Sequence, residues 1–120
     1  MTLAFKHLIT ASNGETELAG KRLRVYTVLG LYEMGESAES IADNYDLPLA
    51  AVYEALAYAV DHPDEMEAIT RADEAADEHI LSQVPEQVRE DARRVIQKHE
   101  QQRLEAIRRT REARLGAPIS

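Results

Sequence analysis

The histidines and carboxylates of this chain do not have the spacing that metal binding or catalysis would need. A carboxylate-bridged metal site on a helix places Glu three residues before His. The residues that stand three positions before His62, His79 and His99 are Ala59, Ala76 and Ile96. The chain also has no Cys, no Gly-x-Ser-x-Gly turn and no glycine-rich phosphate loop. We therefore expect neither an enzyme nor a bound cofactor or metal.

A short run of cations, Lys21, Arg22 and Arg24, is the candidate nucleic-acid contact. The residues around it predict a short β-hairpin, with extended segments at 5–11 and 18–25 and a Ser-Asn-Gly turn between them. Side chains alternate along a strand, so Arg22 and Arg24 would share one side and could both meet phosphates. A solvated strand face would look the same, and the sequence leaves both interpretations open.

Three short helices are predicted after the hairpin. Apolar residues with helical spacing run from Val25 to Tyr32, and Gly35 follows where a left-handed cap would end the first helix. Ser37 is a good N-cap for the second helix. Pro48 suits the first turn of the third, where its missing N–H is not needed. The apolar stripe expected to face inward on the third helix is Leu49, Val52, Leu56 and Val60.

The second and third of these helices have the spacing of a helix-turn-helix, in which the later helix offers hydrogen-bond donors to base edges. The positions off the inward stripe of the third helix are Ala50, Ala51, Glu54, Ala57 and Tyr58. Alanines donate no hydrogen bonds, and phosphates would repel Glu54. We therefore expect this helix not to read bases, which leaves the hairpin cations as the better candidates for any contact with DNA.

Two further helices complete the expected fold. Pro63 begins an acidic helix, and the segment from Glu86 to Leu115 contains no Gly or Pro and would reach about 45 Å as one helix. The predicted fold is mainly α, with a short N-terminal β-hairpin, a three-helix homeodomain-like core, an acidic helix and a long C-terminal helix. The expected parts are the hairpin with the helix-turn-helix core at 1–62, the acidic helix on or near that core at 63–84, and a mildly basic extension at 85–120.

Charge is distributed unevenly along the chain. The net charge is −8, but residues 1–85 hold 5 Lys and Arg against 16 Asp and Glu, whereas residues 86–120 hold 9 against 6. Guanidinium groups suit carboxylates or phosphates, and exposed apolar side chains beside them favour a protein partner. Pairing with acids of the same helix is the alternative for any single arginine. The candidate partner-binding residues are Val88, Arg93, Arg94, Val95, Ile96, Arg103, Leu104, Ile107, Arg108 and Arg111.

Membrane insertion is not expected. The longest apolar run, Ala55 to Val60, has six residues, whereas a membrane-spanning helix needs roughly 20. The absence of Cys fits a reducing interior. We expect a cytoplasmic protein that does not contact membranes.

Several short motifs resemble a known family. They are Gly20-Lys21-Arg22-Leu23-Arg24-Val25, Gly35 with Ser37-Ala38-Glu39-Ser40-Ile41-Ala42, Tyr45-Asp46-Leu47, Val52-Tyr53 and Ala55-Leu56-Ala57-Tyr58. Together they resemble, over about residues 5–66, a small prokaryotic family long filed as a domain of unknown function. That family is regarded as VapB-like antitoxins, often encoded beside PIN-like ribonuclease toxins.

The resemblance implies a homodimer with a homeodomain-like core and a C-terminal extension that embraces the toxin. The expected function is therefore an antitoxin-like module that neutralises a PIN-like ribonuclease toxin through its C-terminal helix and binds DNA weakly as a dimer. The alternative is a homo-oligomeric structural adaptor that associates through its long helices, without DNA or toxin.

Overall fold

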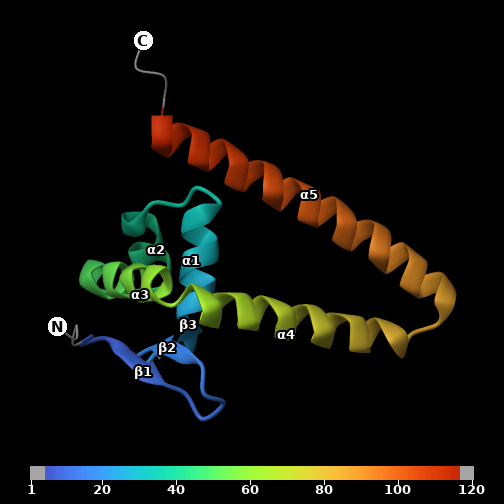
Figure 1. Ribbon diagram of the computed structural model, residues 1–120, viewed down its shortest axis with the longest axis horizontal. Coiled ribbons are helices and arrows are strands. Elements are labelled where there is room, and N and C mark those ends of the chain that lie inside the picture. The colour runs from blue at the N-terminus through green and yellow to red at the C-terminus, as the bar shows by residue number, and fades with distance from the viewer. Residues whose placement is uncertain (1–4, 117–120) are drawn as a thin grey trace. The chain divides into compact units, whose positions relative to one another are not determined.

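The structure is a computed structural model that describes residues 5–116, so the expectations for 1–4 and 117–120 lie outside the described residues (Figure 1). The chain divides into two units, Met1–Met66 and Glu67–Ser120. Across the described part there are five helices and a small three-stranded sheet. The prediction of a mainly helical protein with a small N-terminal β-structure is confirmed.

The sheet is antiparallel, with β1 (Leu8–Thr10), β2 (Thr16–Leu18) and β3 (Leu23–Arg24) in that spatial order. Leu8 pairs with Leu18 at one end of the β1–β2 ladder, and Thr10 pairs with Thr16 next to the turn. Gly14 adopts a φ of 87° in this turn, a conformation that glycine enters without steric cost. The predicted turn chemistry is thus confirmed.

The second extended segment differs from the expectation. A single strand was predicted from residue 18 to 25, but the chain turns after Leu18 and a new strand begins at Leu23. Gly20 and Arg22 have φ values of 78° and 51°, and Lys21 N donates to Leu18 O at 3.2 Å. Left-handed residues cannot continue a strand, so the hairpin becomes a three-stranded sheet.

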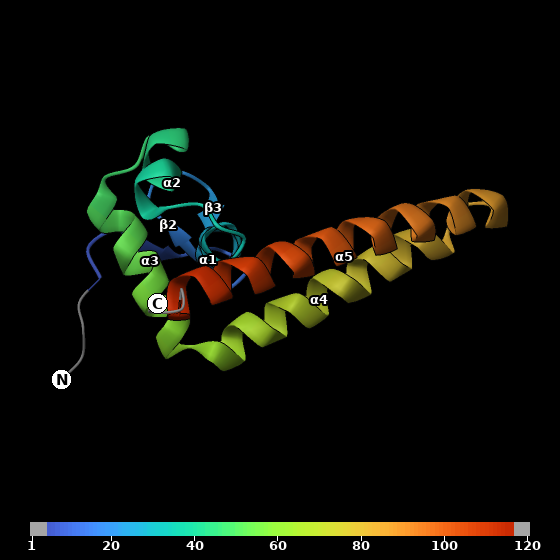
Figure 2. The ribbon, with the colours of Figure 1, turned by 90° about the horizontal axis from the view of Figure 1, so that it is seen from above.

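Three helices follow: α1 (Val25–Glu33), α2 (Ala38–Asn44) and α3 (Leu49–Asp61). The Ser37 side chain accepts a hydrogen bond from the backbone N–H of Ser40, as expected of an N-cap. Gly35 has a φ of 115° and ends α1 as predicted. The three helices gather over the small sheet, and α3 contacts both α1 and α2 (Figures 1 and 2).

The connections after α1 and α2 follow one hydrogen-bonding pattern. Beyond α1, the N–H of Glu36 donates to Leu31 O at 3.1 Å, and beyond α2 the N–H of Leu47 donates to Ala42 O at 2.8 Å. These six-residue closures satisfy carbonyls that the helix ends leave free. The residue in the left-handed position after α2 is Asp46, with a φ of 52°.

The core of the first unit is formed by small and β-branched side chains. Its buried apolar residues are Leu18, Leu23, Val25, Val28, Ala38, Ile41, Ala42, Ala51, Val52, Ala55, Ala59 and Met66. Alanines on α3 allow its backbone to approach α1 and α2 closely, which produces dense packing from small volumes.

The inward stripe predicted for α3 is wrong in part. Val52 is buried, but Leu49 is 39% exposed and Val60 is 77% exposed. Ala51, which was expected on the outer side, is buried. The tightly packed alanines thus turn the larger aliphatic side chains of α3 toward solvent.

Two long helices complete the chain: α4 (Pro63–Ser82), which begins at the predicted proline, and α5 (Glu86–Gly116). A three-residue connection joins them, and the two helices diverge from this connection (Figure 1). Among the described side chains of α5, none is buried.

Candidate protein-binding surfaces

The hairpin cations do not lie on one strand face. Lys21 and Arg22 belong to the turn before β3, and only Arg24 lies in the strand. The expectation that Arg22 and Arg24 alternate along one strand is therefore wrong. Lys21 Nζ lies 3.7 Å from a carboxylate oxygen of Asp46, and Arg24 Nη1 lies 3.7 Å from one of Glu15.

Glu54 of α3 faces the N-terminal segment instead of open solvent. Its Oε1 accepts a hydrogen bond from the backbone N–H of His7 at 3.0 Å, and its Oε2 pairs with the His7 ring at Nδ1. Burial raises the pKa of Glu54, but the hydrogen bonds and charge of His7 outweigh burial and leave this pKa below its ordinary value of 4.5. Glu54 is thus an ionised link between α3 and the start of the sheet.

Tyr58 occupies the same side of α3 and links three elements. The Thr16 hydroxyl donates to the Tyr58 hydroxyl at 3.0 Å, and the Tyr58 hydroxyl donates to Glu65 Oε1 at 2.9 Å. Its ring stacks on His62 with centroids 3.9 Å apart and meets Phe5 edge-on at 5.9 Å. Burial, reinforced by the neighbouring Glu65 carboxylate, raises the pKa of Tyr58 above 10.0, so the phenol keeps its proton.

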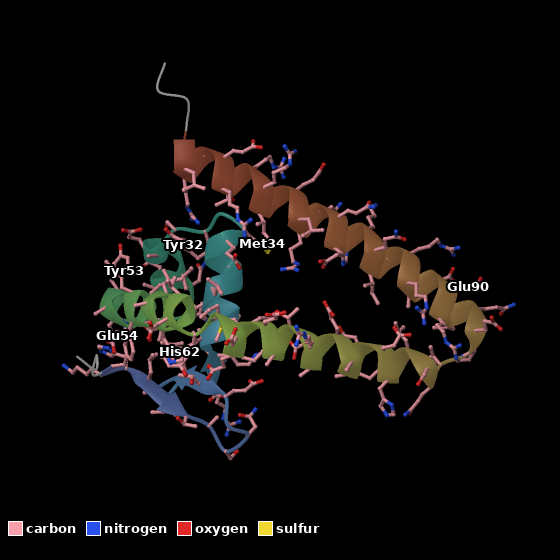
Figure 3. All side chains as sticks on the ribbon, viewed as in Figure 1. Tyr32, Met34, Tyr53, Glu54, His62 and Glu90 are labelled. Carbon is pink, nitrogen blue, oxygen red and sulfur yellow. The ribbon has the colours of Figure 1, made fainter. Side chains whose placement is uncertain are left out.

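The outer face of α3 is therefore formed only in part by the expected residues: Ala50 and Ala57 are exposed, but Ala51, Glu54 and Tyr58 are not on this face. Tyr53 is 52% exposed and lies on the side of α3 opposite Glu54 in Figure 3. A shallow groove runs along this outer face toward α1. It is lined by Tyr32, Tyr53, Leu56, Ala57, Val60 and Asp61. We call these residues the α3 groove.

The helices that flank the α3 groove carry a net negative charge, although Glu54 pairs with His7 and Asp46 lies near Lys21. Residues 25–61 contain seven Asp and Glu and no Lys, Arg or His. Asp61 lines the groove itself. A surface of this kind repels polyanions and attracts cationic side chains.

The arginines proposed to bind a partner are close to acids of their own unit. Arg93 Nη2 lies 2.6 Å from Glu78 Oε1 across the α4–α5 connection, and Arg94 pairs with Asp91. Arg103 binds Glu100 through two hydrogen bonds, and Arg108 Nη1 lies 3.3 Å from Glu112. The structure thus confirms that arginines in this helix find acids locally, as the alternative expectation held.

These local pairs do not prevent the arginines from binding a partner. Most of the paired side chains are more than half exposed, and all are at least two-fifths exposed. Exposed ion pairs contribute only about 0 to 1 kcal/mol each. A partner carboxylate can therefore replace the local acid at little cost.

The apolar side chains of α5 form two patches on different faces. Val88, Val95 and Ile96 lie in the first half and Leu104 and Leu115 in the second, and all five are exposed. Ile107 also lies in the second half and is half-buried. At about 100° per residue, the centres of the two patches differ by about 120° around the helix axis. The patches adjoin at Ile96 and Ile107, which lie within about 20° of each other, whereas Val88 and Val95 point away from the second patch.

Arg89 was not among the candidate residues, yet it determines the geometry of the α4–α5 connection. Its Nε donates to Leu81 O at 3.0 Å, and its Nη2 donates to Ser82 O at 3.2 Å and Val84 O at 3.1 Å. The carbonyls at the end of α4 have no partner within the helix, and a cation there also meets the negative end of the helix dipole. The sequence signal was an arginine one turn after Pro85, following a helix end.

Residues 5–116 contain no cluster of metal ligands and no helix suited to a bilayer. No group of three or more His, Asp or Glu side chains in this range could hold a metal ion. None of the helices described there combines the length and apolar character needed to span a bilayer.

The fold and surface geometry describe a small helical protein with exposed apolar faces. Residues 11–59 match the model of the family DUF433, described as a protein of unknown function. The predicted resemblance to a family of unknown function is confirmed over these residues, which run from the β1–β2 turn to the last turn of α3. No curated protein and no solved structure matches the chain significantly.

Proposed function

We propose that this protein is an antitoxin-like binding module that neutralises a PIN-like ribonuclease toxin through α5. The observation that supports the proposal is the exposure of α5 to solvent. The helix has 31 residues and no buried side chain among those described, yet it exposes Val95, Ile96 and Leu104. A helix this polar gains little stability from propensity alone, so a partner along its apolar patches supports it.

The arginines of α5 supply the chemistry of inhibition. A ribonuclease that uses metal ions has a pocket of carboxylates, and a guanidinium group matches a carboxylate with two parallel hydrogen bonds. Arg94 and Arg108 are exposed and form local ion pairs, and Arg103 pairs with Glu100 with two-fifths of its side chain exposed. In the proposed complex, one of these arginines enters the acidic pocket and takes the place of the metal cation.

We further propose that α2 and α3 act as a helix-turn-helix whose role is structural, with weak DNA binding by a dimer through the sheet. The exposed start of α3 offers Leu49, Ala50 and Tyr53, none of which carries a charge for phosphates. The hairpin cations Lys21, Arg22 and Arg24 carry the positive charge of this unit near the sheet. They are the residues proposed to contact phosphates.

The test of the toxin-binding proposal is capture of the protein encoded beside this one. The full chain is expected to co-purify with that protein and to suppress its ribonuclease activity. Val88→Asp combined with Val95→Asp places charge in the first apolar patch of α5 and should abolish capture. Gln97→Asp adds a charge at an exposed position on the opposite side of the same helix and should leave capture unchanged.

Two outcomes would count against the proposal. The first is equal capture by the full chain and by a chain ended at Pro85. The second is equal loss of capture in the Gln97→Asp control. The alternative, a homo-oligomeric adaptor that associates through its long helices, predicts that no neighbouring protein is captured.

A further inference from the structure

The α3 groove is an apolar surface with the spacing of a helix-pairing seam. Tyr53, Leu56 and Val60 of the groove follow Leu49, which lies one turn before it, at successive intervals of four, three and four residues. This alternation places them on one side of a helix and is the spacing by which helices interlock side chains. Tyr53 is 52% and Val60 77% exposed, so the described unit leaves the seam largely uncovered.

The charge of this surface restricts what can cover it. Seven carboxylates and no cation lie between residues 25 and 61. Pairing of two α3 grooves in an antiparallel arrangement would bring Asp61 of each copy toward the Asp46 end of α3 in the other. Like charges brought together in this way destabilise an interface. The complementary ligand is an amphipathic helix that carries cations beside its apolar side chains.

This chain contains such a helix in the second half of α5. Leu104, Ile107 and Leu115 lie along one side of it, with Arg108 and Arg111 beside them. Residues 101–116 hold five Arg and two Glu, which gives a net charge of +3. This half therefore matches the α3 groove in both apolar spacing and charge.

We propose that the α3 groove binds the second half of α5 from a second copy of this chain. Exchange of the two helices in both directions would form a closed dimer with two equivalent contacts. Val88 and Val95 of the first patch point about 150° away from the second patch and stay accessible to a partner. The inference goes beyond the proposed function, because it assigns a receptor surface on α3 that toxin binding does not use.

The experiment is a pair of charge substitutions, one on each side of the contact. Val60→Asp places a carboxylate in the groove, and Ile107→Asp places one in the second patch of α5. Sedimentation equilibrium of the full chain is expected to give a dimer, with a dissociation constant at least about tenfold higher for each variant. Asn44→Asp and Gln102→Asp add the same charge at exposed positions outside the contact, Gln102 on the side of α5 opposite Leu104 and Ile107, and should leave the constant unchanged.

Mixing the two variants provides the decisive measurement. A Val60→Asp chain keeps an intact α5, and an Ile107→Asp chain keeps an intact groove, so one of the two contacts can form between them. An equimolar mixture should therefore contain heterodimers at a concentration at which each variant alone is monomeric. Raised salt should weaken the wild-type dimer, because part of its attraction is electrostatic.

Three results would overturn the inference. A monomeric wild type would mean that the groove binds no second copy. A dimer that survives Ile107→Asp would mean that α5 is not the occupant. Two dissociated variants that do not associate when mixed would exclude exchange between groove and helix. Far-UV circular dichroism of each variant verifies folding, which the 77% exposure of Val60 favours. Capture of a toxin is tested separately with the Val88→Asp and Val95→Asp chain, which leaves the second patch intact, so failure of one proposal does not imply failure of the other.

Discussion

The Glu54 carboxylate accepts a hydrogen bond from the backbone N–H of His7 and pairs with its ring, although the two residues are 47 positions apart. This contact links α3 to the segment that immediately precedes β1. Both side chains are less than one-third exposed, so solvent only partly screens the interaction. Glu54→Gln should therefore lower the free energy of unfolding by about 1 to 2 kcal/mol at pH 7. Urea denaturation followed by tyrosine fluorescence reports on the first unit, since all five tyrosines lie between residues 26 and 58.

The effect of Glu54→Gln should depend on pH. The pKa of Glu54 is lower in the folded chain than its ordinary value of 4.5, so the folded state favours the ionised form. Its contribution to stability is complete above about pH 4.5 and is lost as the pH falls through the lower, folded pKa. The difference between wild type and variant should thus shrink on going from pH 7 to acid. A difference that stays constant down to pH 3 would falsify this account of the contact.

Two glycines offer a matched pair of substitutions with opposite expected signs. Gly35 has a φ of 115° after α1, where an L side chain is strained, so Gly35→Ala should cost about 1 to 2 kcal/mol of unfolding free energy. Gly30 lies inside α1, and a Cβ added there meets no atom within 4 Å. Gly30→Ala should stabilise the same unit by about 0.5 to 1 kcal/mol. The same urea titration measures both, and a Gly35→Ala variant as stable as wild type would contradict the proposed cap.

The helix ends were predictable because their causes are local. Ser37, Gly35 and Pro63 act within one turn of their own positions, through a side-chain cap, a left-handed conformation and a missing N–H. The prediction of one extended segment after Leu18 was wrong. Arg22 adopts a left-handed conformation although it is not a glycine, and its residue type does not predict a turn.

The orientation of α3 could not be read from its own sequence. The helix carries two apolar stripes, one of alanines and Val52 and one with Leu49 and Val60. Hydrophobicity favours the larger side chains for the core, but close packing against α1 and α2 selects the alanines. The rotation of α3 about its axis therefore depends on tertiary packing. It also places Glu54 and Tyr58 on the side that meets the sheet, and not on the outer face where they were expected.

The hairpin cations provide a quantitative prediction for DNA binding. The logarithm of the binding constant falls linearly with the logarithm of salt concentration. If Lys21, Arg22 and Arg24 each contact one phosphate, replacing all three with Ala should make this slope shallower by about 3, at about 0.9 per contact. Fluorescence anisotropy with duplex from the region upstream of the gene, measured at several salt concentrations, gives this slope. Arg71→Ala, in an exposed α4 pair with Glu67, is the control and should leave the slope unchanged. An unaltered slope in the triple variant would mean that these three cations beside the sheet do not contact DNA phosphates.

The last prediction concerns Arg89 and the connection between α4 and α5. The Arg89 guanidinium donates to the carbonyls of Leu81 and Ser82 in α4 and of Val84 in the connection, so Arg89→Ala removes three hydrogen bonds and releases the connection. Backbone amides near residues 80–90 should then exchange with deuterium about tenfold faster, equivalent to about 1.4 kcal/mol of local stability.

Arg89→Lys should recover only part of that protection, since an ammonium group cannot reach three carbonyls with a fixed fork. Arg93→Ala is the matched control because Arg93 makes one exposed ion pair, with Glu78 at 2.6 Å, near the same connection. Loss of that pair should cost about 0 to 1 kcal/mol. Equal exchange in the Arg89→Ala and Arg93→Ala chains would mean that charge near the connection, and not the three carbonyl contacts, holds α4 and α5 together.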